Sequence, residues 1–286
     1  MNHRIALFFF TAFFLLFAAC DIVEEPYMTG PPDDENGNGN GEIIRKVLLE
    51  KYTGHHCPGC PAGADMAKTL QDLYGDKLVV VSIHAGWFAR VTPDEFDYDF
   101  STDAGEDFYD FFGVAENPIG MVNRNVYEGS LLLSPSAWAE AIEEYTGDAP
   151  QFQLEINMQH HETDNELEVC VDIGSLVNSD CLYYLSVFLI EDGIIKPQKT
   201  NDANYPDGVI MEYEHNNVLR KAINGSWGDR LNDSPITTDD QFLNNYRVNI
   251  DQEWVLDNTS IVAFVYHFPT YEVMQVEMLP FVDAQR

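Results

Sequence analysis

The stretch RKVLLEKYTGHHCPGCP at residues 45–61 decides the fold of the first half of the chain. Its apolar run from Val47 predicts a short strand, and residues 61–74 have the apolar spacing of a helix. Cys57 and Cys60 therefore lie in a turn that opens a helix, where unpaired N–H groups favour a thiolate. We expect Cys57 to be the exposed nucleophile and Cys60, about one helical turn further in, to be the resolving thiol.

A Cys-Pro-Gly-Cys turn between a strand and a helix, followed by a second strand at residues 78–84, resembles the first half of a thioredoxin-like domain. The run Asn117-Pro118-Ile119-Gly120 lies where such domains carry a cis-proline loop facing the disulfide. The resemblance implies a cis bond before Pro118 and a groove there in which a substrate segment docks. The residues alone do not imply this isomer, because only about one X-Pro bond in twenty is cis in folded proteins.

Residues 1–19 have the composition of a signal peptide, since Arg4 is their only Lys or Arg and an apolar core precedes Cys20. The run LFAAC that ends at Cys20 resembles a bacterial lipobox, which implies that Cys20 is lipidated and begins the mature protein. An ordinary secretory signal with a chance cysteine is the alternative. Residues 20–41 are rich in Gly, Asn, Pro and acids, a composition that predicts a flexible tether.

The five cysteines divide into the lipid anchor, the Cys57/Cys60 pair and a last pair, Cys170 and Cys181. In an oxidising compartment this last pair is expected to form a structural disulfide. The loop that it closes is short, so the bond would stabilise the fold by about 3 kcal/mol if its geometry permits.

The chain carries 48 acidic and 15 basic residues, a formal charge of −33 that is spread along its length. This charge excludes nucleic acid as a partner and disfavours anionic lipid except through the anchor. Residues 94–110 hold eight acids and no base. A solvated acidic face is favoured there over a calcium site built from Asp97, Asp99 and Asp103, and no metal site is predicted.

Alternation of strands and helices predicts an α/β thioredoxin-like domain over residues 42–148. From residue 149 the pattern changes to strands, which predicts an all-β antiparallel sandwich of the immunoglobulin-like kind over residues 149–286. The expected strands are residues 152–159, 166–173, 182–190, 246–250, 260–267 and 273–279. Residues 182–190 are apolar on both faces.

A more particular resemblance rests on three runs, YEHNNVLR at residues 213–220, CPGC at 57–60 and NPIGMVNR at 117–124, together with the lipobox. They resemble the outer-membrane-protein-twenty-eight-related lipoprotein family over nearly all of the mature chain. The resemblance implies a lipid-anchored protein of the outer membrane, on its periplasmic or cell-surface face. It does not carry an activity.

Three interpretations of Cys57 and Cys60 compete. The leading one is a thiol-disulfide oxidoreductase that acts on protein thiols or disulfides and needs no cofactor. The second is a zinc or copper site with His55 and His56, which is weakened because the chain has no second Cys-x-x-Cys. The third is a permanent disulfide in a non-catalytic binding or adhesion lipoprotein of the cell surface.

Three further residues could support redox chemistry. His56 could stabilise a Cys57 thiolate, or it could be a solvated loop histidine. Glu50 or Lys51 falls near the position where thioredoxins keep a buried acid for proton transfer. Counting back from Cys57 puts Lys51 at that position, which departs from the thioredoxin pattern.

Overall fold

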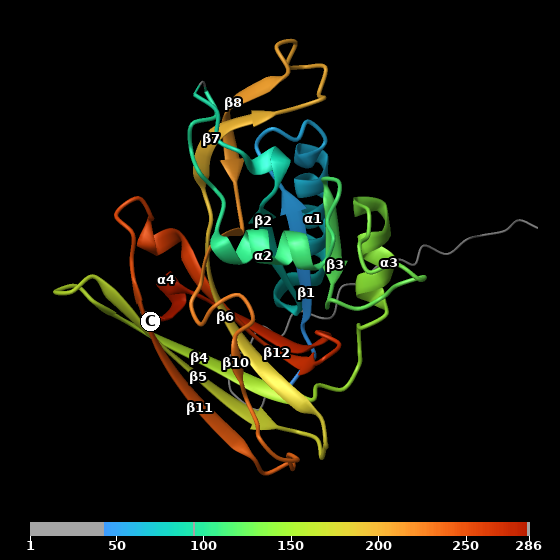
Figure 1. Ribbon diagram of the computed structural model, residues 1–286, viewed down its shortest axis with the longest axis vertical. Helices are drawn as coiled ribbons and strands as arrows, with labels where there is room; N and C mark the ends of the chain where they lie inside the picture. The colour runs from blue at the N-terminus through green and yellow to red at the C-terminus, as the bar shows by residue number, and fades with distance from the viewer. Residues whose placement is uncertain (1–42, 94, 285–286) are drawn as a thin grey trace, which may run out of the picture. The chain divides into compact units, whose positions relative to one another are not determined.

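The computed structural model describes residues 43–93 and 95–284 (Figure 1). The predicted signal peptide, Cys20 and the tether lie outside these residues. The helices are α1 (Cys60–Tyr74), α2 (Asp103–Phe111), α3 (Trp138–Glu143) and α4 (Phe281–Ala284). The strands of the first half are β1 (Val47–Thr53), β2 (Leu78–His84) and β3 (Ile119–Val122). Those that follow are β4 (Phe152–His161), β5 (Glu166–Ser175), β6 (Leu182–Glu191), β7 (Ile194–Lys199), β8 (Val209–His215), β9 (Val218–Ala222), β10 (Asp229–Arg230), β11 (Gln241–Asn249), β12 (Thr259–Phe268) and β13 (Val273–Pro280).

One long sheet runs through both halves of the chain, in the order β13-β12-β6-β9-β2-β1-β3, with β10 paired to β6. β1 and β2 are parallel, as a strand-helix-strand unit requires. The two halves meet where β9 lies beside β2, with Ser82 opposite Val218 and the Ser82 N–H donating to the Asn217 carbonyl at 2.7 Å. Without β9, β2 would be an edge strand with unpaired backbone groups. The predicted boundary at residues 148 and 149 is therefore not a break in the sheet.

Helices cover both faces of the β1-β2-β3 part of this sheet. Helices α1 and α3 pack on one face, where Leu49, Val80 and Trp138 belong to one buried cluster. Helix α2 packs on the opposite face, where Phe108 shares a cluster with Val81. Figure 1 shows α2 crossing in front of β1 and β2. Because both faces are covered, β1 and β2 are buried along their whole length, and most of their residues are apolar.

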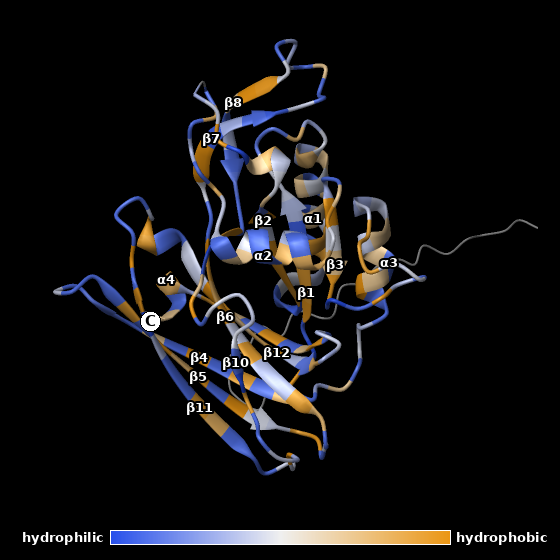
Figure 2. Ribbon diagram, viewed as in Figure 1, coloured by the Kyte–Doolittle hydropathy of each residue, from blue (hydrophilic) through white to orange (hydrophobic). Residues whose placement is uncertain are grey.

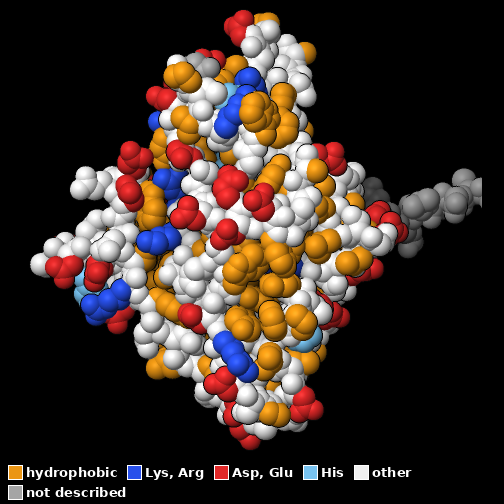
Figure 3. Space-filling view, in the orientation of Figure 1, with side chains coloured by type: hydrophobic (Ala, Val, Ile, Leu, Met, Phe, Trp, Pro, Cys, Tyr) orange, Lys and Arg blue, Asp and Glu red, His pale blue; other side chains and the backbone are white. Residues whose placement is uncertain are grey.

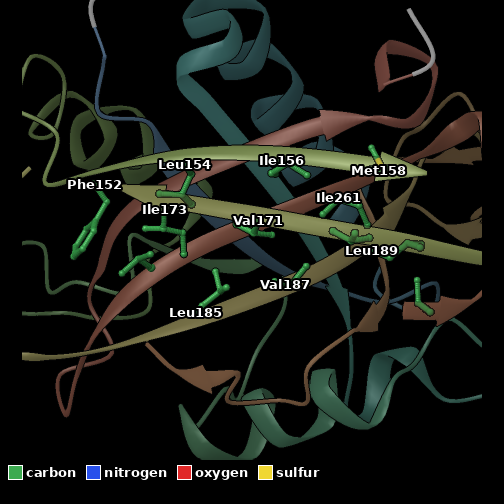
Figure 4. Close-up of a cluster of buried hydrophobic side chains, with 14 of the residues drawn as sticks. Phe152, Leu154, Ile156, Met158, Val171, Ile173, Leu185, Val187, Leu189 and Ile261 are labelled. Carbon is green, nitrogen blue, oxygen red and sulfur yellow. The ribbon is translucent and has the colours of Figure 1, made fainter. Parts of the chain in front are cut away.

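The β6-β12 part of the sheet also has two covered faces. Leu185 and Val187 point toward a second, three-stranded sheet in the order β11-β5-β4, and Figure 4 shows the side chains between the two layers. Phe188 and Ile190 point to the other face, into the cluster that includes Phe108 of α2. This arrangement explains why residues 182–190 are apolar on both faces. In Figure 2 the outer strands β4, β5 and β11 alternate between hydrophobic and hydrophilic residues instead.

The α/β arrangement of the first half and the antiparallel strands of the second agree with the predicted fold class. The sandwich differs from the expected separate domain, because one of its two layers is the continuation of the β1-β2 sheet. Its immunoglobulin-like assignment stays a prediction. The antiparallel hairpin β7-β8 and strand β9 were not anticipated from the sequence.

The expected disulfide between Cys170 and Cys181 is absent, and both residues are free cysteines. Cys170 lies on the outward face of β5, because its neighbours Val169 and Val171 are the residues that face the core. Cys181 precedes β6 and packs against the core from its own side. The alternation of β5 therefore points the Cys170 thiol away from the layer that holds Cys181.

Candidate functional site

Cys57 and Cys60 form a disulfide at the start of α1, with an S–S distance of 2.22 Å and a Cα–Cα distance of 5.4 Å. Cys57 lies in the turn, and Cys60 is the first residue of the helix. The Cys60 N–H donates to the Cys57 carbonyl at 3.2 Å, so the turn is closed by backbone as well as by sulfur. The predicted strand-turn-helix placement of the pair is confirmed.

The bond between Asn117 and Pro118 is cis, as the resemblance to thioredoxin-like domains implied. Pro118 lies directly against the start of α1. A Cβ atom added at Gly63 would lie 2.8 Å from Pro118 Cβ, and one at Gly59 would lie 3.4 Å from Pro118 Cδ. Gly63 has no side chain, which permits this close approach. The two cysteines and Pro118 are therefore brought together by the fold.

Both sulfur-bearing residues are buried, with Cys57 1% exposed and Cys60 2% exposed. The exposure expected for Cys57 is wrong, because residues 198–201, which we call the covering segment, lie across the turn. The Lys199 N–H donates to the His55 carbonyl at 2.8 Å, and the Asn201 N–H to the Pro58 carbonyl at 3.0 Å. This segment begins in strand β7, which lies more than 130 residues from the cysteines in the sequence, so local patterns gave no signal for it.

Gln198 fixes the covering segment to the turn through its side chain. Its buried amide Nε2 donates to the Cys57 carbonyl at 3.0 Å and to the Gly54 carbonyl at 3.3 Å. Gly54 itself has no room for a side chain, because an added Cβ would lie 2.3 Å from the Phe88 carbonyl group. The backbone around the disulfide is thus packed between residue 88 on one flank and residue 198 on another.

The two histidines that precede Cys57 are buried, and the solvated loop histidine considered for His56 is not found. The Nε2 atom of His56 lies 3.2 Å from the Thr92 hydroxyl, and that of His55 lies 2.8 Å from the Arg90 carbonyl. Their rings also contact Phe96. These contacts bind the turn to the loop after β2, and the described residues contain no group of three His, Cys, Asp or Glu side chains placed to hold a metal ion.

The sequence left open whether Glu50 or Lys51 lies near the disulfide, and the structure decides between them. Glu50 points to the α2 face of β1, where both of its carboxylate oxygens accept from Arg124 at 2.7 Å. Lys51 points to the α1 face and lines a cavity together with Cys60. Burial lowers the pKa of Lys51 to about 8, against a smaller opposing influence of Asp65. Of the two candidates, only Lys51 shares a space with the disulfide.

This cavity has a volume of about 510 Å³ and lies between α1, the ends of β1 and β2, and the turn from β8 to β9. Its buried polar lining consists of Lys51, Thr53, Cys60, Ser82, His84, Gln198 and His215. His84 is not the satisfied core histidine that its place at the end of a strand suggests, because neither ring nitrogen has a hydrogen-bond partner among the residues that the structure describes. Burial is the largest cause that lowers the pKa of His84 and that of His215, the latter to about 3.

Part of this cavity could have been found in the sequence. The run at residues 213–220, one of the most particular motifs of the chain, supplies His215, Asn216 and Asn217 to the lining. Arg220, the last residue of this run, does not line the cavity and instead pairs with Glu191 at 3.3 Å. Gln198 and Ser82 carry no comparable signal.

A different surface gathers hydrophobic side chains near the middle of one face, over α2 and the strands beside it (Figure 3). Phe111, Trp227 and Tyr271 contact one another there, with ring centroids 4.7 and 4.9 Å from Phe111. The disulfide and its cavity remain the candidate site, because they combine a reactive bond with buried ionisable groups. No helix in the described ranges is long and apolar enough to cross a membrane.

Comparison with known proteins identifies the family. The family model described as outer membrane protein Omp28 matches residues 105–280, more than half of the chain. The chain therefore belongs to the Omp28 family of outer membrane proteins, and the expected family and outer-membrane location are confirmed. No curated protein matches the chain.

Three solved structures are similar to this chain. HBP35 of Porphyromonas gingivalis has 17% identity and a TM-score of 0.62, over 84% of this chain and 76% of that chain. A protein of Agrobacterium tumefaciens has 8% identity and a TM-score of 0.50, over 84% of this chain and 96% of that chain. A domain of the outer membrane lipoprotein Omp28 from Porphyromonas gingivalis has 22% identity and a TM-score of 0.31, over 46% and 89%. At these identities the first two likenesses show the fold alone.

Proposed function

We propose that this Omp28-family protein is a lipid-anchored thiol-disulfide oxidoreductase whose redox couple is Cys57/Cys60, held in a thioredoxin-like arrangement. One observation carries the proposal: the disulfide opens α1 directly beside cis-Pro118, and its Cys60 side borders an open cavity. A permanent bridge needs neither the helix start nor the adjoining space. The helix N-terminus and the Lys51 ammonium in the same cavity both favour a thiolate at this pair.

The chemistry is thiol-disulfide exchange in two steps. In the reduced protein the Cys57 thiolate attacks one sulfur of a substrate disulfide, which forms a Cys57–substrate bond and releases the other substrate sulfur as a thiolate. The Cys60 thiolate then attacks Cys57 Sγ, re-forms the Cys57–Cys60 disulfide and releases the second substrate thiolate. The substrate gains two electrons and the protein loses two. The reverse sequence oxidises a substrate dithiol, and the reduction potential sets the direction.

The covering segment determines access in this proposal. A protein substrate reaches Cys57 only when residues 198–201 move away, because these residues hold hydrogen bonds to the turn from both backbone and side chain. Each such bond contributes about 1 kcal/mol net, so opening a few of them is compatible with a folded protein.

A second function has a specific observation in its favour. Cys57 and Cys60 are both nearly inaccessible, and the chain's own backbone occupies the surface above them. These facts also suit a non-catalytic binding or adhesion lipoprotein in which the disulfide only stabilises the turn.

Reduction of the folded protein separates the two functions. We expect dithiothreitol to reduce the wild-type pair slowly and the Gln198→Ala variant several times faster, because the variant loses the side-chain bonds that fix the covering segment. Gln159→Ala, an exposed glutamine on β4, is the matched control and should behave as wild type. Thermal melts of all three proteins show whether a faster rate reflects local opening or global unfolding.

Adduct formation is the second readout. Incubation of Cys60→Ser with a disulfide-bonded peptide should accumulate a mixed disulfide on Cys57 that mass spectrometry detects, whereas Cys57→Ser should give none there. If the pair resists dithiothreitol in folded wild type and in folded Gln198→Ala, and no adduct forms, the binding lipoprotein replaces the oxidoreductase.

The anchor is tested separately. Lipidation at Cys20 would place the folded part at the membrane surface on a tether. Labelling cells with a palmitate analogue should mark the wild type and not Cys20→Ser, and equal labelling of both would remove the anchor from the proposal.

A further inference from the structure

The cavity beside Cys60 has the dimensions of a ligand site. Its volume of about 510 Å³ falls within the usual range of roughly 300–1,000 Å³ for small-molecule pockets. Several separate parts of the chain build it: α1, the ends of β1 and β2, the residues around the β8–β9 turn, and Asp192 and Gln198 from the β6–β7 region. Its walls are therefore set by the sheet and not by one flexible loop.

The floor of the cavity presents donors that have no acceptor. Lys51 is 6% exposed, and no carboxylate in the described part of the chain forms an ion pair with it. His84 is 3% exposed, and both of its ring nitrogens lack hydrogen-bond partners within that same part. A buried polar group without a partner costs about 1–3 kcal/mol, so native proteins seldom leave one, such as the His84 ring, without a use for it.

Three of the four acidic side chains that line the cavity are exposed at its mouth. Asp65 and Asp72 of α1 and Glu214 of β8 line the cavity but are exposed to solvent. The fourth acid of the lining, Asp192, is half-buried and accepts a hydrogen bond from the Asn217 backbone N–H. Lys68, the other lysine of the lining, is also exposed and is paired with Asp72 at 3.1 Å. The buried lysine of the cavity therefore lies at its closed end, and the exposed carboxylates lie at its open end.

We propose that this cavity binds a small zwitterion, of the class of free amino acids and short peptides, with its carboxylate against Lys51 and His84. The Lys51 ammonium and an imidazole N–H of His84 donate to the carboxylate oxygens. The ligand's ammonium group lies toward Asp65 and Glu214 at the mouth. A neutral imidazole has one N–H to donate, and a charge-assisted bond from lysine is the stronger of the two contacts.

The electrostatics support this orientation over the reverse. Burial lowers the pKa of Lys51 to about 8, so the side chain is still mainly protonated at neutral pH. A carboxylate beside it would restore the interaction that the ammonium lost on leaving water. An ammonium group pointed inward would meet Lys51 instead, and like charges at close range repel strongly inside a protein.

Calorimetric titration of the full-length protein tests the proposal with alanyl-alanine, its C-terminal amide and its N-acetyl derivative as probes. We expect alanyl-alanine to bind, the amide to bind at least about tenfold more weakly, and the acetylated dipeptide to lose a smaller factor. The amide comparison needs no altered protein, so it stays informative whatever a variant does to folding.

Two variants assign the contacts. Lys51→Met and His84→Phe should each weaken alanyl-alanine about tenfold or more, while Lys77→Met, a half-buried lysine outside the cavity, should leave it unchanged. The proposal is overturned if the amide binds as well as the free acid, if neither cavity variant weakens binding, or if no probe binds at millimolar concentration. None of these outcomes depends on redox activity at Cys57 and Cys60.

Discussion

Glu50 and Lys51 are neighbours on β1, and both are buried, yet their surroundings differ completely. Glu50 is held by two hydrogen bonds from Arg124, whose guanidinium lies 5.0 and 5.1 Å from the ring centroids of Phe108 and Phe264. Lys51 forms no such ion pair with any residue that the structure describes, and it borders an open cavity. A buried charge with a well-placed counterion is part of the fold, whereas one without a counterion lowers stability and is retained for another reason. The comparison separates the side of β1 that holds a structural ion pair from the side that borders the candidate site.

The largest change in stability is expected on the side of β1 where Arg124 pairs with Glu50. Arg124→Met would leave the Glu50 carboxylate buried without its counterion, and we expect the free energy of unfolding to fall by about 3–5 kcal/mol. Urea denaturation at neutral pH measures the change. Arg247→Met is the control, because Arg247 is 62% exposed and its pairs with Glu166 and Glu168 lie at the surface.

The control should lose less than about 1 kcal/mol. If Arg124→Met lowered the free energy of unfolding no more than Arg247→Met does, the Glu50–Arg124 pair would not stabilise the fold. The contrast between the two faces of β1 would then fail.

The next effect is of opposite sign. Lys51→Met should raise the free energy of unfolding at pH 7 by up to about 3 kcal/mol, since the drop in pKa from 10.5 to about 8 measures how much burial penalises the ammonium. Below pH 8 both the folded and the unfolded chain hold this proton, and the penalty is complete. Between pH 8 and 10.5 the unfolded chain holds more protons, so wild-type stability gains on the variant as the pH rises.

Denaturation of wild type and Lys51→Met at several pH values between 7 and 11 checks this prediction. Tyrosines titrate at the upper end of the range, but they are common to both proteins and cancel in the difference. A difference that stays constant with pH would mean that Lys51 keeps an ordinary pKa and has a partner in solution.

The sequence predicted the strand-turn-helix around the cysteines, the two flanking strands and the place of Pro118, because these depend on local spacing and on turn residues. It could not decide between Glu50 and Lys51. Adjacent residues on a strand buried on both faces have no polar side to mark which way each one points.

The covering segment and the cavity were also beyond the sequence. Both arise where residues 198–217 meet the β1-β2 edge, a contact between parts of the chain more than 100 residues apart. Alternation identifies a strand but does not name its neighbour in the sheet, so the pairing of β9 with β2 was not expected. The prediction that Cys57 is exposed was wrong for that reason. The prediction of a disulfide between Cys170 and Cys181 was wrong because the spacing of two cysteines does not show whether their side chains face each other.

The smallest of the three effects concerns His215, the last residue of β8, which lines the same cavity as Lys51. Burial lowers the pKa of His215 from 6.5 to about 3, so between these values the unfolded chain binds the proton and the folded chain does not. Stability should therefore fall as the pH falls below 6.5, and His215 accounts for about 2 kcal/mol of that loss at pH 5.

His215→Phe separates this histidine from the other acid-sensitive groups, because it keeps an aromatic ring against Phe100 and Tyr213 while removing the titration. The stability of the variant relative to wild type should rise as the pH is lowered from 6.5 to 5, in urea denaturation at fixed temperature. His161→Phe is the control, since its half-exposed ring pairs with Glu168 on the far sheet. If wild type and His215→Phe lose stability in parallel as the pH falls, the folded protein does not hold the pKa of His215 below that of the unfolded chain. The cavity then accommodates a charged imidazole as well as water does, and the two sides of β1 differ in shape and not in polarity.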